Sequence, residues 1–222
     1  MKYLENADVS PKKVHAGDSV EFRIKLTVGS GFVTEGSRIL LDLPGELGYS
    51  RPTRGNPEDP GYVEARCSNP SLRWRLSCWN LGSGAFETAR SLYENKHAQR
   101  LCVLDLPGGE LHAGDTITVL WGFLRDGFGQ GTKVGILAPS PDFTDTIDIR
   151  YFVDGTRALP DRGHSYVGYE RPQPDRRLSV SFQVLPREPS RLRLLPGRTG
   201  PAPGFWCWTA FPTSAVWRVW KG

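Results

Sequence analysis

The side chains that most often do chemistry are dispersed along this chain. Two of its four histidines, His15 and His112, stand in a repeated His-Ala-Gly-Asp word, where a solvated turn histidine is the expected state. The acidic neighbours Glu58 and Asp59 diverge if their loop is extended, which is poor geometry for an acid–base pair. The sequence lacks the Gly-x-Ser-x-Gly, His-Glu-x-x-His and Walker patterns. We therefore predict no catalytic residues and no enzymatic activity for this chain.

Two segments have compositions that can bind ions. Asp142, Asp145 and Asp148 recur at three-residue intervals, and Ca²⁺ prefers several such oxygen ligands. On a strand, however, Asp145 and Asp148 point to opposite faces and cannot share one ion. The glycine-rich segment 123–131 could cradle a phosphate, but a strand at 133–137 follows it instead of a helix N-terminus. We predict neither a metal nor a cofactor.

The cysteines leave two alternatives open. The four are Cys67, Cys78, Cys102 and Cys207, and no CxxC pair with metal-ligand spacing occurs among them. A Cys67–Cys78 disulfide across a hairpin is one alternative, if the protein is exported. Free, buried thiols are the other, and we favour it.

Aromatic and basic side chains supply the candidate ligand-binding residues. Trp79, Tyr49 and Tyr62 are the aromatic rings that could stack on a sugar. Arg73 and Arg75 share a predicted strand face with Trp79, a combination that can bind single-stranded nucleic acid. Arginines also occur on any solvent-facing strand, and the formal net charge is only +4, so we do not expect a nucleic-acid partner.

Strands separated by turns are the elements that position these residues. Residues 19–28 alternate strictly between apolar and polar, and residues 111–122 bring Ile117, Val119 and Trp121 to one face. Similar runs predict strands at 38–43, 62–67, 72–80, 100–106, 133–137, 143–154 and 178–184. Residues 62–67 and 72–80 are predicted to form a hairpin, with Leu72, Trp74, Leu76 and Cys78 on one face of its second strand. The pattern predicts an all-β antiparallel sandwich with long loops and at most one short helix, at 85–99.

Two short words recur: His-Ala-Gly-Asp at 15–18 and 112–115, and Leu-Asp-Leu-Pro-Gly at 41–45 and 104–108. Both could mark a duplicated half-sandwich. Similar chemistry at strand ends is the alternative, which we favour because the intervening lengths differ.

The 222 residues suit one large β domain, or one domain with the start of a second. We predict a sandwich domain at 1–190, with 191–222 as a linker or the start of a second domain. Residues 196–222 contain Trp206, Trp208, Trp217 and Trp220, of seven tryptophans in all. This tail is either an aromatic strip facing a ligand or membrane, or the product of a shifted reading frame. The N-terminus has no apolar signal core and no segment is long enough to span a bilayer. Cytoplasmic location is thus the default, unless the N-terminus is truncated.

Several motifs resemble the N-terminal region of large bacterial proteins. They are Ala16-Gly17-Asp18, Asp59-Pro60-Gly61-Tyr62-Val63, Gly114-Asp115-Thr116-Ile117, Gly129-Gln130-Gly131-Thr132-Lys133 and Phe152-Val153-Asp154-Gly155. In that family an immunoglobulin-like sandwich precedes a metal-dependent hydrolase domain resembling the polymerase-and-histidinol-phosphatase type. The resemblance covers residues 8–195 and implies an immunoglobulin-like fold. The hydrolase part of that family is missing from this sequence.

These observations favour a non-catalytic accessory or interaction module of a larger hydrolytic protein. Its partner would be a covalently linked downstream domain or another protein. A carbohydrate-binding module that uses the exposed aromatics on a polysaccharide is the first alternative. A stand-alone enzyme with a site built from loops 44–61 and 123–131 is the second.

Overall fold

A computed structural model describes residues 3–44, 49–81, 99–124, 129–134, 143–158 and 173–186, with backbone only for 79–81 and 99. The chain divides into two compact units, Met1–Arg187 and Glu188–Gly222. The second unit, and with it the tryptophan-rich tail, lies outside the described residues.

The described part of the chain is built of β-strands and contains no α-helix. The strands are β1 Leu4–Ser10, β2 Lys13–His15, β3 Ser19–Val20, β4 Phe22–Val28, β5 Ser37–Leu43, β6 Val63–Cys67, β7 Arg73–Leu81, β8 Gln99–Gly108, β9 Thr116–Trp121, β10 Thr132–Lys133, β11 Phe143–Phe152 and β12 Arg176–Leu185. One 3₁₀ turn, η1, spans Gly155–Ala158. The predicted all-β class is confirmed. Of the segment predicted as a short helix, residues 85–98 lie outside the described residues, and Gln99 begins β8.

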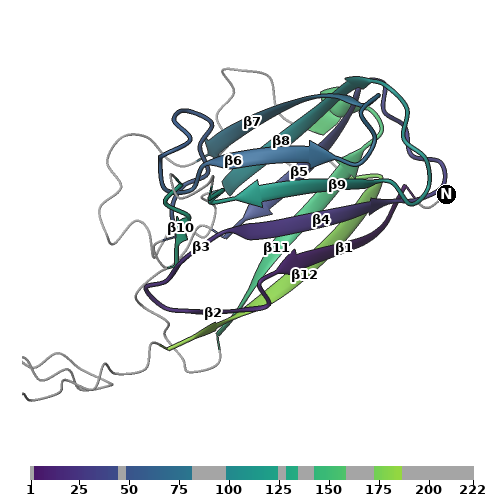
Figure 1. Ribbon diagram of the computed structural model, residues 1–222. Helices are drawn as coiled ribbons and strands as arrows, with labels where there is room; N and C mark the ends of the chain where they lie inside the picture. The colour runs from purple at the N-terminus through teal and green to yellow at the C-terminus, as the bar shows by residue number, and fades with distance from the viewer. Residues whose placement is uncertain are drawn as a thin grey trace, which may run out of the picture. The chain divides into compact units, whose positions relative to one another are not determined.

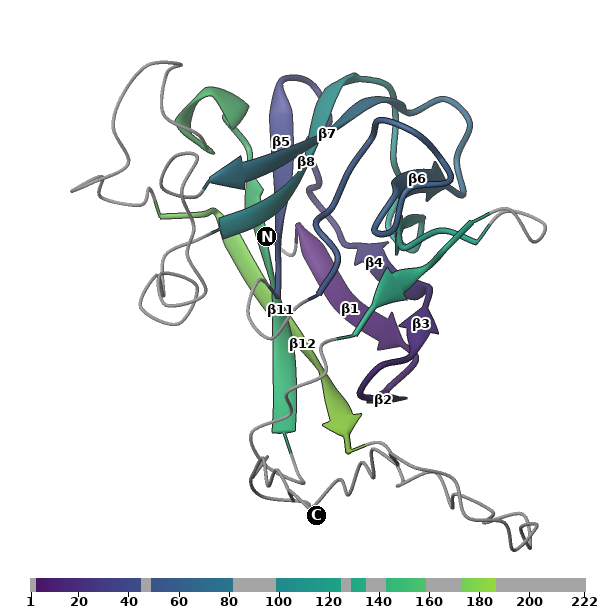
Figure 2. The same ribbon diagram turned by 90° about the vertical axis from the view of Figure 1, so that its left-hand side faces the viewer.

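Two sheets face each other in a sandwich-like arrangement (Figure 1). The first sheet has the strand order β1-β4-β9-β6, and the second has the order β2-β12-β11-β5-β8-β7. Among the described strands pairing is antiparallel, except between β2 and β12, which run parallel. At one side of the sandwich the edge strands β6 and β7 lie next to each other, as the view in Figure 2 also shows.

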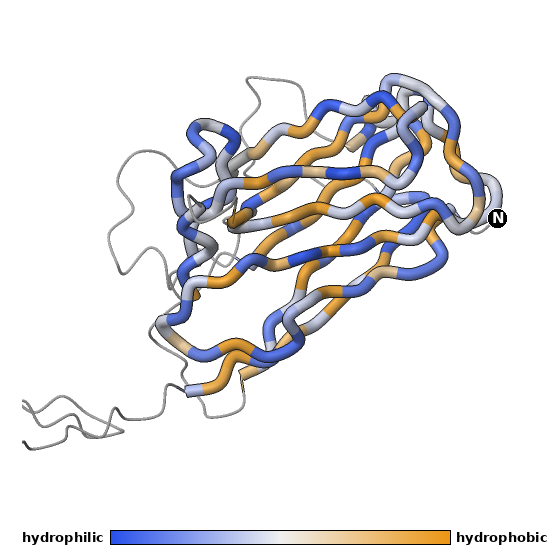
Figure 3. Tube along the Cα trace, in the orientation of Figure 1, coloured by the Kyte–Doolittle hydropathy of each residue, from blue (hydrophilic) through white to orange (hydrophobic). Residues whose placement is uncertain are grey.

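Apolar and polar residues alternate along the strands, as the hydropathy colouring in Figure 3 shows. The buried apolar side chains form the core between the two sheets. Phe22, Ile24 and Leu26 of β4 are buried, and so are Ile117, Val119 and Trp121 of β9. Across the core, Ile147, Ile149 and Tyr151 come from β11 and Val180, Phe182 and Val184 from β12. Burial of each large apolar side chain contributes about 1.5–3 kcal/mol. The inward faces predicted for these strands are confirmed.

Part of the outer face of the second sheet, at β5, β8 and the end of β11, is buried as well as the inner face. Leu40, Leu101, Val103, Phe152 and Ala158 form a separate apolar cluster there. Ala158 belongs to η1, which packs on β5. A simple alternation of core and solvent therefore does not describe β5.

The hairpin predicted for residues 62–67 and 72–80 is wrong. β6 pairs with β9 in the first sheet, whereas β7 pairs with β8 in the second. The segment between them crosses from one sheet to the other. The turn signal at Ser68-Asn69-Pro70 located a reversal of the chain correctly, but it carried no information about which partner each strand would take.

Candidate functional site

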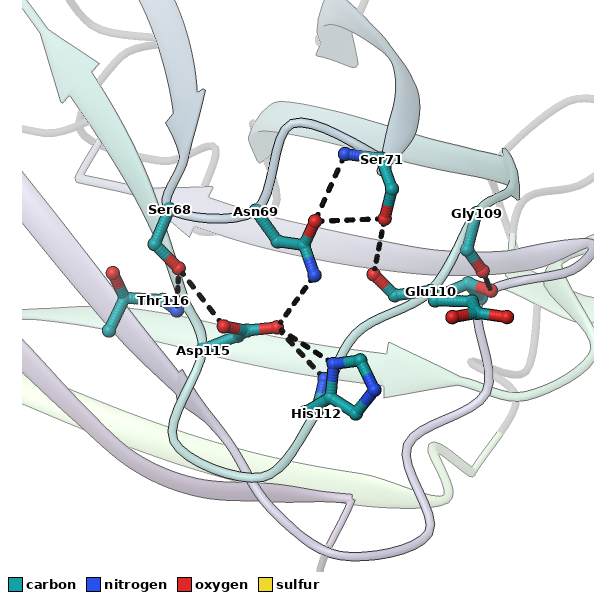
Figure 4. A network of polar contacts seen from close by, with 9 residues as sticks. Ser68, Asn69, Ser71, Gly109, Glu110, His112, Asp115 and Thr116 are labelled. Carbon is teal, nitrogen blue, oxygen red and sulfur yellow. Dashed lines mark hydrogen bonds and ion pairs between the residues drawn. The ribbon is translucent and has the colours of Figure 1, made fainter.

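Polar contacts join the loop after β6 to the loop before β9 (Figure 4). The Asp115 carboxylate accepts hydrogen bonds from the His112 N–H at 2.9 Å, the Asn69 amide at 3.2 Å and the Ser68 hydroxyl at 3.4 Å. The Ser68 hydroxyl accepts one from the Thr116 N–H at 2.8 Å. These bonds, that of the His112 N–H foremost, hold the pKa of Asp115 below its usual value. Asp115 is therefore ionised at neutral pH and anchors both loops.

Serine, histidine and aspartate meet in this network, but their order is not that of a nucleophilic triad. In a triad the histidine lies between the serine and the carboxylate, so that it can take the serine proton. Here Asp115 lies between Ser68 and His112. The His112 imidazole is 75% exposed, and its Nδ1 lies 3.8 Å from the carboxylate. The arrangement holds loops in place and is not built to activate a nucleophile.

The repeated His-Ala-Gly-Asp word forms the same turn twice. The His15 N–H donates to the Asp18 carboxylate at 3.1 Å, as the His112 N–H does to Asp115. In both turns the aspartate N–H donates back to the histidine carbonyl, at 3.1 and 3.0 Å. The glycine has a φ of +86° in the first turn and +95° in the second, which a type II turn requires at this position. Both imidazoles are exposed, as predicted for turn histidines.

The most prominent exposed group of aromatic and basic side chains lies on β7. Arg73, Trp74 and Arg75 are all exposed, and 36% of the surface of Trp74 is open to solvent. We call these three residues the β7 edge surface. Within the described part of the chain neither arginine makes an ion pair, so both charges are available to a partner. β7 is the terminal strand of the second sheet and has a ladder neighbour, β8, on one side.

Trp74 was predicted to share a strand face with Leu72, Leu76 and Cys78, and this prediction is wrong. Leu72 and Leu76 are buried as expected, but the regular pairing breaks between Arg73 and Arg75. Arg73 pairs with Gly108 and Arg75 with Asp105, so two residues of β8 lie opposite Trp74. Such a bulge changes the direction of side chains next to it. The Leu-Pro-Gly-Gly run at 106–109 is the sequence signal that could have revealed it, because proline donates no ladder hydrogen bond.

Tyr62 is half-buried and its ring is already covered. The Arg54 guanidinium lies 5.3 Å from the ring centroid. Arg54 Nη1 also donates hydrogen bonds to the Tyr62 hydroxyl at 3.1 Å and to the Val63 carbonyl at 2.8 Å. A cation over the ring occupies the face that a sugar would need.

Tyr49 was predicted as a stacking residue, and the structure contradicts this. Only 3% of Tyr49 is exposed. Its ring lies 5.8 Å from Trp121 and 6.3 Å from Phe182, in the core. Burial, and then the nearby Asp145 carboxylate, raise the pKa of its hydroxyl. A residue so enclosed cannot present a face to a ligand.

Trp79 was the third predicted stacking residue. Its backbone belongs to β7, but its side chain lies outside the described residues. Of the five predicted ligand-binding residues, the structure therefore brings Arg73 and Arg75 together at the surface. It separates them from Tyr49.

The two loops considered for an enzymatic site do come together. The Gly61 N–H donates to the Gly131 carbonyl at 3.1 Å, and the Ser50 N–H to the Lys133 carbonyl at 3.2 Å. In the first loop the Asp59 carboxylate accepts from the Asn56 N–H at 3.4 Å, which closes a turn. Residues 45–48 and 125–128 lie outside the described residues.

The aspartates and cysteines of the described residues can be placed as well. Asp145 lies beside Tyr49, whereas Asp148 pairs with Arg177, so the two carboxylates have different surroundings. Within the described ranges, no group of three or more His, Cys, Asp or Glu is arranged to hold a metal. Cys67, Cys78 and Cys102 are free thiols, and Asp142 and Cys207 lie outside the described residues. No described helix is long and apolar enough to cross a membrane.

Fold and surface together define the class: an all-β protein of two facing sheets with a basic and aromatic edge strand. No family model matches the chain, and no curated protein matches it in sequence. The chain is similar to the solved structure of AvmM, which catalyses macrocyclization in alchivemycin A biosynthesis, with a TM-score of 0.31 and 13% identity. That similarity covers 86% of this chain and 93% of AvmM. At this TM-score the likeness carries no argument about function.

Proposed function

We propose that this chain is a non-catalytic accessory or interaction module of a larger, hydrolytic bacterial protein. The observation that carries the proposal is the β7 edge surface, where an exposed tryptophan stands between two arginines that form no ion pair with any described residue. Tryptophan and arginine are the residue types that most often dominate binding energy at interfaces. The two positive charges favour a partner with acidic groups.

The position of this surface on an edge strand supports a protein partner. An edge strand has unpaired N–H and C=O groups, to which an extended segment of another chain can add as a further strand. β7 is such a strand in the described part of the chain. The partner we propose is therefore an extended acidic segment of the linked downstream domain or of a separate protein.

We also propose that the sandwich is immunoglobulin-like. The two N-terminal strands belong to different sheets: β1 pairs antiparallel with β4, while β2 pairs parallel with β12. The four-stranded and six-stranded sheets then pack face to face around one core. One departure is the position of β6, which comes before β7 and β8 in the chain but belongs to the other sheet.

The test begins with the coding sequence beyond codon 190, read independently for several hundred bases. A continuous frame into a domain rich in His and Asp would supply the predicted partner. That domain, produced separately, should bind the sandwich, and Trp74→Ala and Arg75→Ala should each weaken binding by about tenfold or more. Arg23→Ala is the matched control, because Arg23 is an exposed strand arginine in the other sheet, paired with Glu21.

The proposal predicts that Arg23→Ala leaves the dissociation constant nearly unchanged. If no such domain is encoded, the accessory role in a hydrolytic protein is refuted. If the domain binds but the β7 substitutions have no effect, the β7 edge surface is not the docking site.

Carbohydrate binding is the second candidate, and the exposed ring of Trp74 is what favours it. Aromatic rings stack on the apolar faces of sugars, and the flanking arginines would select acidic polysaccharides. A panel of alginate, pectin and heparin, with dextran as the neutral control, tests this directly. Saturable binding that Trp74→Ala abolishes and Leu124→Ala spares would establish it; Leu124 is exposed elsewhere. A blank panel would eliminate it.

A further inference from the structure

Two cysteines face each other across neighbouring strands of the second sheet. Cys78 of β7 and Cys102 of β8 are direct partners in the antiparallel ladder. Their sulfur atoms lie 4.0 Å apart and form a thiol–thiol hydrogen bond. Directly opposite residues in such a pair have Cα atoms about 4.5–5.5 Å apart, which is inside the range that a disulfide spans. Bond formation requires the sulfur atoms to move from 4.0 Å to about 2.05 Å apart.

The two thiols differ in their access to solvent. Cys102 is completely buried in the core, whereas Cys78 is half-buried at the edge strand. Only Cys78 can therefore be reached by a reagent from outside.

Electrostatics reinforce this difference. The hydrogen bond from Cys102, and then the positive charge of Arg54, lower the pKa of Cys78. Burial raises the pKa of Cys102 well above its usual value. Because the thiolate is the nucleophile, Cys78 is suited to attack first and Cys102 to react second.

We propose that Cys78 and Cys102 form a modification site, a cross-strand dithiol that small disulfides such as oxidised glutathione convert to a disulfide. The Cys78 thiolate attacks one sulfur of the oxidant, forming a mixed disulfide and releasing one thiolate. Cys102 then loses its proton and attacks the Cys78 sulfur, which releases the second thiolate. In total two protein thiols are oxidised and one small disulfide is reduced to two thiols.

The bond would fasten the edge strand that carries the β7 edge surface. β7 has one ladder neighbour in the described part of the chain, so its pairing with β8 is what holds it. A covalent link at Cys78 fixes that pairing and closes the chain between residues 78 and 102 into a loop. The inference does not depend on the identity of the partner that binds there.

Cys67 is not an alternative partner for Cys78. It lies in β6, in the other sheet, and its ladder partner is Ile117. Cysteine spacing in the sequence suggested a Cys67–Cys78 bridge only because the two strands were taken for one hairpin.

Alkylation followed by peptide mapping tests the site in the full chain. After equilibration with oxidised glutathione and reaction with N-ethylmaleimide, the protein should carry two labels fewer than the reduced protein with its four cysteines. Trypsin should then release peptides 76–90 and 101–125 joined by a disulfide. In the reduced protein Cys78 should react with N-ethylmaleimide at least about tenfold faster than Cys102.

Variants separate the two roles. Cys102→Ala should leave a stable glutathione adduct on Cys78, because no second thiol can displace it. In Cys78→Ala, Cys102 should remain unmodified, and Cys67→Ala should still form the bond. Circular dichroism identifies any variant that fails to fold. Peptide mapping of the wild-type protein tests the proposed disulfide independently of the variants. A persistent adduct on Cys78 of the wild type, labels retained on both thiols, or a bond to Cys67 would each overturn the proposal.

Discussion

The Tyr151 hydroxyl makes two hydrogen bonds to the backbone of Val33, which is 118 residues away in the chain. It donates to the Val33 carbonyl at 2.7 Å and accepts from the Val33 N–H at 3.0 Å. The ring lies in the core against Phe32, with 4.7 Å between the centroids. This single side chain thus ties the loop between β4 and β5 to β11.

Replacing Tyr151 by phenylalanine should lower the free energy of unfolding by about 1–3 kcal/mol. Two hydrogen bonds are lost at about 1 kcal/mol each, and the Val33 groups must find other partners. Urea unfolding followed by tryptophan fluorescence gives the value. Tyr3→Phe is the control, since no hydrogen bond of the Tyr3 hydroxyl occurs in the described part of the chain; its effect should stay within about 0.5 kcal/mol. Equal stability of Tyr151→Phe and wild type would contradict the role assigned to this contact.

Gly109 and Gly114 lie close together in the chain, and alanine should affect them very differently. Both have positive φ, +107° and +95°. A Cβ on Gly109 would lie 2.4 Å from the Ser71 carbonyl oxygen and 2.8 Å from Leu72 Cα, whereas a Cβ on Gly114 would meet nothing within 4 Å. Gly114→Ala should cost about 1–2 kcal/mol of backbone strain. Gly109→Ala should cost at least about 3 kcal/mol, because backbone atoms must also move. Similar losses in thermal or urea unfolding would refute the close approach at Gly109.

Asp115 should make stability depend on acid pH. Its pKa is lowered in the folded protein, so its stabilising effect is present above the unfolded value of about 3.9 and is lost as pH falls through the folded value. Asp115→Asn should lower the urea midpoint at pH 7, and its difference from wild type should shrink at acid pH. Asp18→Asn, in the same turn without the Ser68 and Asn69 contacts, should lower the midpoint less. A constant difference at all pH values would contradict the assignment.

Tyr49 is buried and Trp74 is exposed. Alanine substitutions should therefore reduce stability much more at Tyr49 than at Trp74. Tyr49→Ala should cost about 3–5 kcal/mol, as expected for a large side chain removed from a packed core. Trp74→Ala should cost less than Tyr49→Ala, since 36% of Trp74 is already in water, against 3% of Tyr49. The same urea titration measures both. A larger loss for Trp74→Ala than for Tyr49→Ala would reverse the assignment.

The sequence by itself determined most of the strands and the inward faces of β4 and β9. Phe22, Ile24 and Leu26 alternate with charged or polar neighbours, and a strand places alternate residues on opposite sides whatever its surroundings. The His-Ala-Gly-Asp turns were equally predictable, because a glycine with positive φ and an aspartate that accepts hydrogen bonds act within four residues. These features depend on local geometry alone.

Only the tertiary structure decided which strands are neighbours. β6 and β7 are consecutive in the chain but belong to different sheets. β6 pairs with β9, whereas β7 pairs with β8. Alternation states which face of a strand is apolar, but it does not state which other strand will cover that face or in what register.

That choice of partners determined three features of the candidate sites. It exposed Trp74 through an extra residue in β8, buried Tyr49 between Trp121 and Phe182, and set Cys78 opposite Cys102. Each of these outcomes depends on contacts between residues far apart in the sequence. A local sequence pattern carries no information about such contacts, because strand register and packing create them only in the folded chain.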